Sequence, residues 1–147
     1  MHRLLPPVLL IVLLAAMVVL HRLHPPAAAL GAFGTPLGAG LLALGIAGLI
    51  AARFQFRRSE SEIMTFAEPR NLVTGGLFRF SRNPMYLSML LVLLGVAAMV
   101  DLWCALAAPL LFFAAAHFWY IPFEERAAMQ VFGDDYLSYR QQVRRWL

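Results

Sequence analysis

The sequence contains no lysine, a single cysteine and few charged residues of either sign. Only 14% of its 147 residues are charged and 61% are hydrophobic, whereas soluble globular chains have about 25% charged and about 45–50% apolar residues. The scarcity of charge therefore excludes an ordinary soluble domain. One cysteine excludes a disulfide within the chain. Cys104 lies in an apolar block, where we expect it to be a small buried hydrophobe.

The apolar residues are gathered in blocks, which favours an integral membrane protein. About 20 apolar residues cross the hydrocarbon core of a bilayer. The predicted spans are 4–20, 27–52, 84–100 and 102–121. Only Asp101 separates the last two, so we expect a tight helical hairpin there. The prediction is an all-α membrane fold in a single domain, 1–147, with a cytoplasmic or interfacial helical segment at 122–147.

The arginines predict the orientation of these spans. With four spans, eleven of the twelve basic residues fall on one side and only Arg22 on the other. Under the positive-inside rule both termini are then cytoplasmic, in what we expect to be a bacterial inner membrane. All acids except Asp101 fall on the same side. The alternative for the first block, a cleaved signal peptide, is disfavoured by the "HRLHPP" break that follows it.

Two local patterns have structural interpretations. Gly34 and Gly38 have the small-xxx-small spacing that lets helices approach closely, so we expect them to pack. His21 and His24 have the helical spacing of a metal pair but no third ligand nearby, so we predict an interfacial loop and no metal. We also predict no nucleic-acid partner.

The first polar cluster lies in "LVTGGLFRFSRNPMYLSMLLVLLGV", residues 72–96. The glycine pair at 75–76 permits backbone conformations that side chains forbid. Asn83 followed by Pro84 is typical of a helix start, with Asn as the N-cap. Tyr86 then lies in the first turn. The free N–H groups of that turn, beside Arg82, predict an anion site.

The second cluster lies in "HFWYIPFEERAAMQVFGDDYLSYRQQVRRWL", residues 117–147. Pro122 is expected to interrupt the helix, and Glu124 and Glu125 follow at once. Two acids this close to a membrane are costly unless they are solvated, paired or facing a cation. Gly133 predicts a C-cap, with Asp134 or Asp135 starting a final helix.

In that final helix an apolar stripe and a set of arginines predict an interfacial helix on an anionic leaflet. The stripe is Tyr139, Val143 and Trp146, and the polar-facing residues are Arg140, Arg144 and Arg145. His117, before Pro122, is expected to pack rather than to react.

The hairpin should bring the two clusters together. Arg82 and a helix N-terminus would then face two carboxylates, an arrangement that suits a zwitterionic ligand. It equally suits plain salt bridging between Glu124 and Arg82. The spacing leaves both interpretations open.

The segments "LVTGGLFRFSRNPMYLS" and "PFEERAAMQVFGDDYLSYRQQVRRW" resemble the isoprenylcysteine carboxyl methyltransferase and phospholipid methyltransferase group of membrane enzymes. The resemblance covers residues 72–146. It implies S-adenosylmethionine as the cofactor and a hydrophobic, lipid-like or prenylated acceptor at the cytoplasmic face. Catalytic roles are implied for Arg82, Asn83 and Glu125. The implied cofactor pocket is Leu72, Gly76, Phe78, Arg82, Asn83, Pro84, Tyr86, Glu124 and Glu125.

This chain departs from part of the group at Asn83, where members with "RHP" have histidine. Asparagine cannot act as a base near neutral pH, which puts the acceptor's identity in doubt more than the cofactor's. The absence of an obvious base favours a carboxylate acceptor over an amine. The alternative is a non-catalytic four-helix membrane protein whose arginines and glutamates only set topology and pair with each other. A transporter is disfavoured because no ionisable residue lies mid-span except Asp101, which is expected at a turn.

Overall fold

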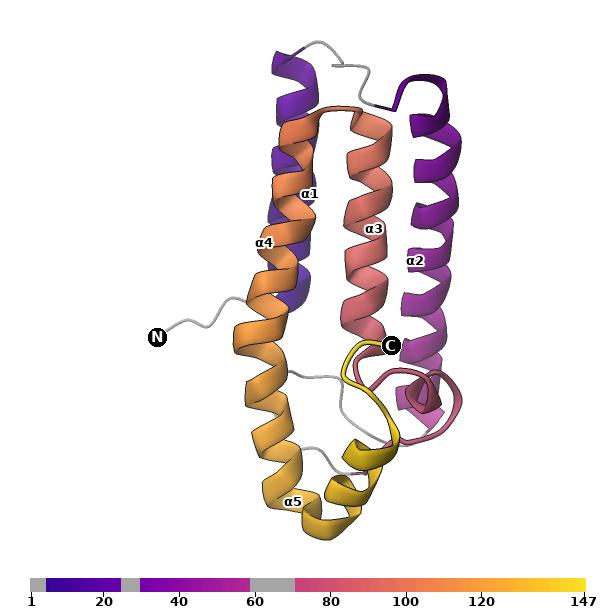
Figure 1. Ribbon diagram of the computed structural model, residues 1–147, viewed down its shortest axis with the longest axis vertical. Coiled ribbons are helices and arrows are strands. Elements are labelled where there is room, and N and C mark those ends of the chain that lie inside the picture. Colours follow the sequence, from indigo (N-terminus) through magenta and orange to yellow (C-terminus); the bar gives the residue numbers. More distant parts are fainter. Residues whose placement is uncertain (1–4, 25–29, 59–70) are drawn as a thin grey trace.

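The computed structural model describes residues 5–24, 30–58 and 71–147. These residues form a bundle of long helices, and none of them lies in a β-strand. The α-helices are α1 (Pro6–Leu23), α2 (Gly34–Arg58), α3 (Pro84–Val100), α4 (Ala107–Ala115) and α5 (Ile121–Gln142). Figure 1 shows α3 in the middle, with α2 on one side and α1 and α4 on the other. The predicted all-α fold is confirmed.

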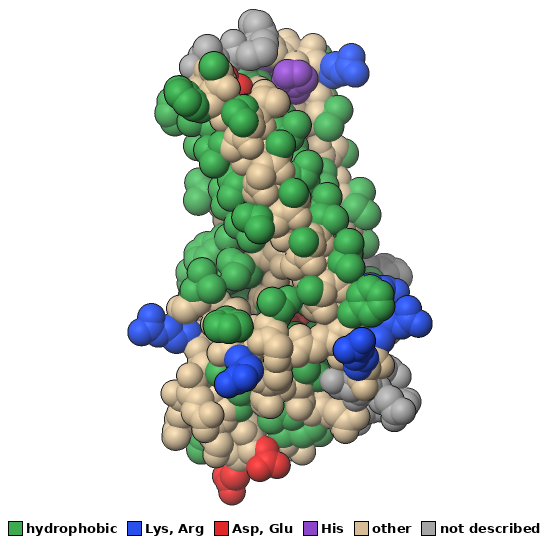
Figure 2. All heavy atoms as spheres, turned by 90° about the vertical axis from the view of Figure 1, so that its right-hand side faces the viewer, with side chains coloured by type: hydrophobic (Ala, Val, Ile, Leu, Met, Phe, Trp, Pro, Cys, Tyr) green, Lys and Arg blue, Asp and Glu red, His purple; other side chains and the backbone are tan. Residues whose placement is uncertain are grey.

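The lengths and compositions of the helices fit a membrane protein. Within the part of the chain that the structure describes, three helical stretches are long and apolar enough to cross a bilayer: Pro6–Leu23, Gly31–Arg58 and Trp103–Gln142. The shorter α3 has 17 residues, or about 25 Å at about 1.5 Å per residue, which still matches a thin hydrocarbon core. Figure 2 shows apolar side chains along most of one face and arginines gathered toward one end.

The predicted spans differ from the helices mainly at their ends. The third matches α3, because Asn83–Pro84 and Asp101 mark its two ends. The first helix ends three residues later than predicted, at Leu23, and the second continues to Arg58. Residues 4 and 27–29, where two spans were predicted to begin, lie outside the described residues. Several charged residues on which the predicted orientation of the spans depends also lie outside the described residues: Arg3, Glu60, Glu62, Glu68 and Arg70.

The prediction that Pro122 interrupts the helix is wrong. The helix is continuous here: α4 is followed by a π turn, Ala116–Tyr120, which leads directly into α5. Pro122 occupies one of the first two positions of α5. Proline lacks an N–H and its ring crowds the carbonyl four residues earlier. A π turn widens the helix at this place and changes which backbone groups pair, so the proline is accommodated without a break.

Close helix packing joins α2 to α3. A Cβ added at Gly34 would lie 2.8 Å from the carbonyl oxygen of Ala98, and one at Gly38 would lie 2.5 Å from that of Gly95. Glycine is therefore required for the two backbones to approach this closely, which confirms the predicted packing role of Gly34 and Gly38. On its other side α3 packs against α1 and α4 through buried side chains such as Leu93 and Phe112.

The turn between α3 and α4 is as tight as predicted. Asp101 ends α3 in the left-handed conformation, with φ of 54°. Its carboxylate accepts hydrogen bonds from the backbone N–H groups of Leu30 (2.6 Å) and Gly31 (3.2 Å), which precede α2. Cys104, in the 3₁₀ turn Trp103–Leu106, is exposed. The expectation that it is buried is wrong, because this turn lies at the end of the bundle.

The end of the chain folds back onto the bundle. Gly133 has φ of 49° and ψ of −119°, which interrupts α5 where a helix end was predicted. Figure 1 shows the chain reversing at this point and returning toward the start of α3. The predicted apolar stripe, at the end of α5 and just after it, packs against protein: Tyr139 is buried against Phe78 with Val143 beside them, and Trp146 packs against the main core. The interpretation of this stripe as a membrane-facing surface is therefore wrong.

Candidate active site

The first polar segment is fastened to the end of α2. The 3₁₀ turn Gly76–Arg79 begins at Gly76, whose φ is +54°. The amide of Gln55 in α2 donates to the carbonyl oxygen of Gly75 and accepts from the N–H of Leu77 at 3.2 Å. A side chain at Gly76 would collide with this amide. Phe78 is buried and meets Phe56 edge to face, with ring centroids 5.1 Å apart.

The start of α3 faces the C-terminal segment. Asn83 occupies the N-cap position as predicted, but its side chain makes no capping hydrogen bond. Its Nδ2 donates instead to the carbonyl oxygen of Arg145 at 3.0 Å. The N–H of Asn83 donates to the hydroxyl of Ser81 at 3.1 Å. Pro84, the first residue of α3, is buried. Asn83 therefore links two distant segments rather than closing its own helix.

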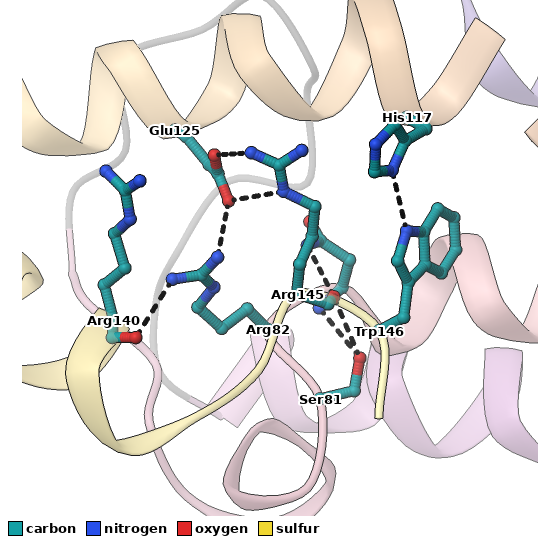
Figure 3. A network of polar contacts seen from close by, with 8 residues as sticks. Ser81, Arg82, His117, Glu125, Arg140, Arg145 and Trp146 are labelled. Carbon is teal, nitrogen blue, oxygen red and sulfur yellow. Dashed lines mark hydrogen bonds and ion pairs between the residues drawn. The ribbon is translucent and has the colours of Figure 1, made fainter. Parts of the chain in front are cut away.

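Glu125 is the centre of a charged cluster, drawn in Figure 3. One of its oxygens lies 2.9 Å from Nη2 of Arg82 and accepts from Nε of Arg145 at 3.2 Å. The other lies 2.6 Å from Nη2 of Arg145. Arg82 also donates from Nη1 to the carbonyl oxygen of Arg140 at 3.2 Å. The side chains of Arg82 and Glu125 are 8% and 11% exposed, so the two sequence clusters meet in a nearly buried ion pair.

The other carboxylate has a different partner. The hydroxyl of Tyr86 donates to Glu124 at 2.8 Å. The ring of Tyr86 is buried and lies parallel to that of Tyr120, with centroids 6.2 Å apart. The alternative prediction was a salt bridge between Glu124 and Arg82. This prediction is wrong about the glutamate, because Arg82 pairs with Glu125. The helical register after the π turn places each acid beside a different residue of α3's start.

One buried donor in the cluster has no acceptor. The Nε of Arg82 has no hydrogen-bond partner within the part of the chain that the structure describes. A buried N–H without an acceptor costs free energy, on the order of 1–3 kcal/mol, and more in a charged group. This unmatched donor favours an additional acceptor at this place.

Two tyrosines close the far side of the cluster, beyond the bend at Gly133. Tyr139 donates its hydroxyl proton to the carbonyl oxygen of Phe78 at 2.7 Å. Burial, and to a lesser extent Tyr136, raises the pKa of Tyr139 to about 12. Burial is also the main cause that raises the pKa of Tyr136, followed by the negative charge of Glu125. Both phenols therefore stay neutral near pH 7 and do not act as bases.

The segment after α5, residues 143–147, covers the cluster, and we call it the C-terminal strap. The carbonyl oxygen of Arg144 accepts from the N–H of Arg82 at 3.0 Å. The indole of Trp146 donates to Nδ1 of His117 at 3.1 Å, as Figure 3 shows. His117 stacks on Phe113, with centroids 5.4 Å apart. This geometry agrees with the packing role expected for His117.

The structure thus brings most of the predicted residues to one end of the bundle, but in two groups. Arg82, Asn83, Tyr86, Glu124 and Glu125 form or adjoin the charged cluster. Leu72 and Phe78 belong to an adjacent apolar cluster with Tyr136 and Tyr139. The sequence missed Arg145, which was predicted to face outward. The double arginine near the end of the chain was its only signal, and spacing alone could not relate it to Glu125.

Two other features bear on ligand binding. Among the described residues no group of three or more histidine, cysteine or acidic side chains could hold a metal.

A cavity of about 220 Å³ lies at the opposite end of the bundle, lined mainly by leucine and alanine and bordered by Asp101. It is far from the charged cluster and offers one carboxylate, which is already bonded to Leu30 and Gly31. It is therefore not part of the candidate site.

Comparison with known protein families gives one match. The family model described as phospholipid methyltransferase matches residues 33–135, more than two thirds of the chain. The matched region includes α2, α3, α4, the first motif, the start of the second motif as far as Asp135, and the Arg82–Glu125 pair. No curated protein and no solved structure matches at a significant level.

Proposed function

Because this chain belongs to the phospholipid methyltransferase family, we propose that it transfers a methyl group from S-adenosylmethionine to a lipid-like or isoprenylated acceptor. The observation that carries the proposal is the nearly buried Arg82–Glu125 pair, which joins the two motifs at 2.9 Å. A polar cluster of this kind, set beside the apolar surface of a membrane protein, suits an enzyme whose polar cofactor meets an apolar acceptor.

The residues present fit the amino acid end of S-adenosylmethionine. That end carries an ammonium and a carboxylate, and the cluster offers both carboxylates, from Glu124 and Glu125, and guanidinium groups, from Arg82 and Arg145. Glu125 or Glu124 would hold the ammonium. The unpaired Nε of Arg82 shows that the buried part of the cluster has donor capacity left for an anion. The pocket residues we propose are Leu72, Gly76, Phe78, Arg82, Asn83, Pro84, Tyr86, Glu124 and Glu125.

S-adenosylmethionine supplies an already activated methyl group on a sulfonium, so the protein need not generate an electrophile. The work left to this chain is binding, orientation and exclusion of water. The C-terminal strap covers the cluster, the turn Gly76–Arg79 lies beside it through the contact of Phe78 with Tyr139, and Tyr86 stacks on Tyr120 next to Glu124. Arg82, Asn83 and Glu125 are the residues we propose at the reacting centre, as fixed polar groups rather than as proton carriers.

We favour a carboxylate acceptor over an amine. A carboxylate is ionised at pH 7 and needs an arginine for orientation, whereas an amine must first lose a proton. Tyr136 and Tyr139 have raised pKa values. His117 uses Nδ1 to accept from Trp146, so its lone pair is not free. An arginine-rich cluster with these neighbours is better suited to an acceptor that arrives already ionised.

The orientation we propose places the cluster at the cytoplasmic face, with both termini on that side. It is supported by Arg53, Arg57 and Arg58 at the end of α2 and by Arg22 near the end of α1, at the other end of the bundle. Figure 2 shows the corresponding gathering of arginines toward one end. The positive-inside rule assigns the arginine-rich end to the cytoplasm.

Binding and transfer can be measured separately. We expect S-adenosylhomocysteine to raise the thermal unfolding midpoint of the purified protein in detergent, because a ligand at 100 times its Kd stabilises the folded state by about 2.7 kcal/mol. Glu125→Gln should abolish the rise, and Asp134→Asn, an exposed acid of α5, should retain it. In a total extract of lipids and membrane proteins, labelled methyl from S-adenosylmethionine should appear in a hydrophobic product.

The same experiments test the alternative, a non-catalytic membrane protein. No rise in the midpoint at saturating ligand, together with no labelled product, would favour that alternative. A rise that Glu125→Gln retains would leave the enzyme in place but remove Glu125 from the cofactor site. Identification of the labelled product names the acceptor and decides between carboxylate and amine.

A further inference from the structure

Glu125 is already occupied by two cations. An ionised carboxylate has about four lone-pair positions, and Arg82 and Arg145 use three of them. A ligand that brought only an ammonium group to this acid would therefore find little free capacity. It would also approach the two arginines, whose positive charges repel it. A zwitterion avoids this cost, because it brings a negative charge together with its ammonium.

The two arginines differ in their freedom to move. Arg82 is 8% exposed, donates from Nη1 to the carbonyl oxygen of Arg140 and is fixed through its own N–H by Arg144. Arg145 is 27% exposed and lies in the strap, beyond the end of α5 at Gln142. Its side chain makes contacts to Glu125 alone among the bonds of the described residues, so less must break for it to turn.

The backbone of Arg145 is nevertheless held in place. Its carbonyl oxygen accepts from Nδ2 of Asn83 at 3.0 Å and from the hydroxyl of Ser81 at 3.5 Å. Trp146, the next residue, is held by His117. The guanidinium can therefore change partners without a movement of the chain, and it stays close to Glu125 when it does.

We propose that Arg145 is the residue that recognises the carboxylate of the cofactor's amino acid end. In this exchange Arg145 gives up a bond to Glu125 and takes the ligand's carboxylate, while Glu125 takes the ligand's ammonium. One opposite-charge contact is lost and two are made, so neither charge of the ligand is left without a partner. A guanidinium pairs well with a carboxylate because it presents two parallel donors. The inference rests on the proposed function and adds to it a residue that the proposed pocket does not include.

The consequence is selectivity for a zwitterion over a plain amine. A decarboxylated analogue must separate Arg145 from Glu125 without offering Arg145 another anion. It should therefore bind the wild type more weakly than S-adenosylhomocysteine does. Removal of the Arg145 charge should take away the contact with the carboxylate of S-adenosylhomocysteine. It should also remove the Arg145–Glu125 bond that the decarboxylated analogue has to break. The two affinities should therefore become more similar.

The test is a comparison of two dissociation constants on the full chain in detergent, by isothermal titration calorimetry. The ligands are S-adenosylhomocysteine and its decarboxylated analogue, in which hydrogen replaces the carboxylate. We expect the wild type to favour S-adenosylhomocysteine by about tenfold or more, the size of a hydrogen bond to a charged group. In Arg145→Gln the preference should fall to about twofold or less, and Arg145→Lys should lie between.

Arg144→Gln is the matched control, because Arg144 is the exposed neighbour and loses the same charge. It should keep the wild-type preference, which separates a local contact from a general effect of charge. Arg145→Lys keeps the charge, so it tests the proposal even where Arg145→Gln folds poorly. A wild type that binds both ligands equally, or an Arg145 variant pair that keeps the full preference, would overturn the inference. A wild type that binds neither ligand would overturn the proposed function itself.

Discussion

The contact between α2 and α3 can be tested by adding a single methyl group. Gly38→Ala places a Cβ 2.5 Å from the carbonyl oxygen of Gly95 and equally close to Cγ of Met99. Ordinary contacts begin at 3.4 Å. The methionine side chain can turn aside, but the backbone oxygen cannot. The two helices must therefore separate by up to about 0.9 Å at this point, since a densely packed interior leaves no space to absorb the overlap.

The expected cost follows from two opposing effects. Overpacking of a close contact destabilises by about 1–3 kcal/mol. Alanine is the better helix former by about 0.8–1.0 kcal/mol. Gly40 lies in the same helix and has nothing within 4 Å of an added Cβ. Gly40→Ala should therefore leave the free energy of unfolding unchanged or raise it slightly. We expect the free energy of unfolding of Gly38→Ala to be about 1–3 kcal/mol lower than that of Gly40→Ala.

The assay is unfolding by sodium dodecyl sulfate from mixed micelles, followed by circular dichroism. The comparison that matters is the difference between the two alanine variants, because helix propensity is common to both and cancels. A Gly38→Ala variant as stable as Gly40→Ala would refute the reasoning. It would mean that α2 and α3 do not approach as closely as their glycines allow.

Two further changes address the far end of the bundle and the cover of the cluster. Asp101→Ala should lower the free energy of unfolding by about 1–3 kcal/mol, because Leu30 and Gly31 lose an acceptor and alanine disfavours a positive φ. Asp101→Asn should cost less in the same unfolding assay; equal losses would contradict this account. Tyr139→Phe should cost about 1–3 kcal/mol by leaving the carbonyl of Phe78 unpaired. Because the pKa of Tyr139 is raised to about 12, the neutral phenol is favoured in the folded state. Its stabilisation should be complete below about pH 10, the ordinary pKa, and be lost as the pH rises through about 12. A cost of Tyr139→Phe that does not decrease from pH 9 toward pH 11 would contradict the linkage.

Local signals in the sequence were sufficient for much of the fold. The bounds of α3 follow from Asn83–Pro84 at one end and Asp101 at the other, although the side chains of Asn83 and Asp101 bond to distant segments rather than to their own turns. The packing of Gly34 and Gly38 follows from spacing along one helix. The meeting of Arg82 with the paired glutamates follows from topology alone, since a hairpin of two spans must return its ends to the same side.

The remaining errors have a common cause in contacts between distant segments. Pro122 lies in a continuous helix because the π turn before it changes the backbone pairing, and a π turn has no reliable signature in a single sequence. The same turn alters the helical register, so Glu124 and Glu125 could not be assigned to partners by counting. Arg145 and Tyr139 face inward because the chain reverses at Gly133, and only the folded structure shows what they then meet.

The hydrogen bonds of Asp101 also bear on how the protein is assembled. They join the connection between the first two helices to the turn between the last two, across about 70 residues of sequence. Helices enter a membrane in order of synthesis. These hydrogen bonds therefore cannot form until α3 has crossed the membrane and Asp101, at its end, lies on the same side as Leu30 and Gly31. Their formation would therefore mark the moment at which the two halves of the bundle become one body, and a probe at Leu30 could time that event.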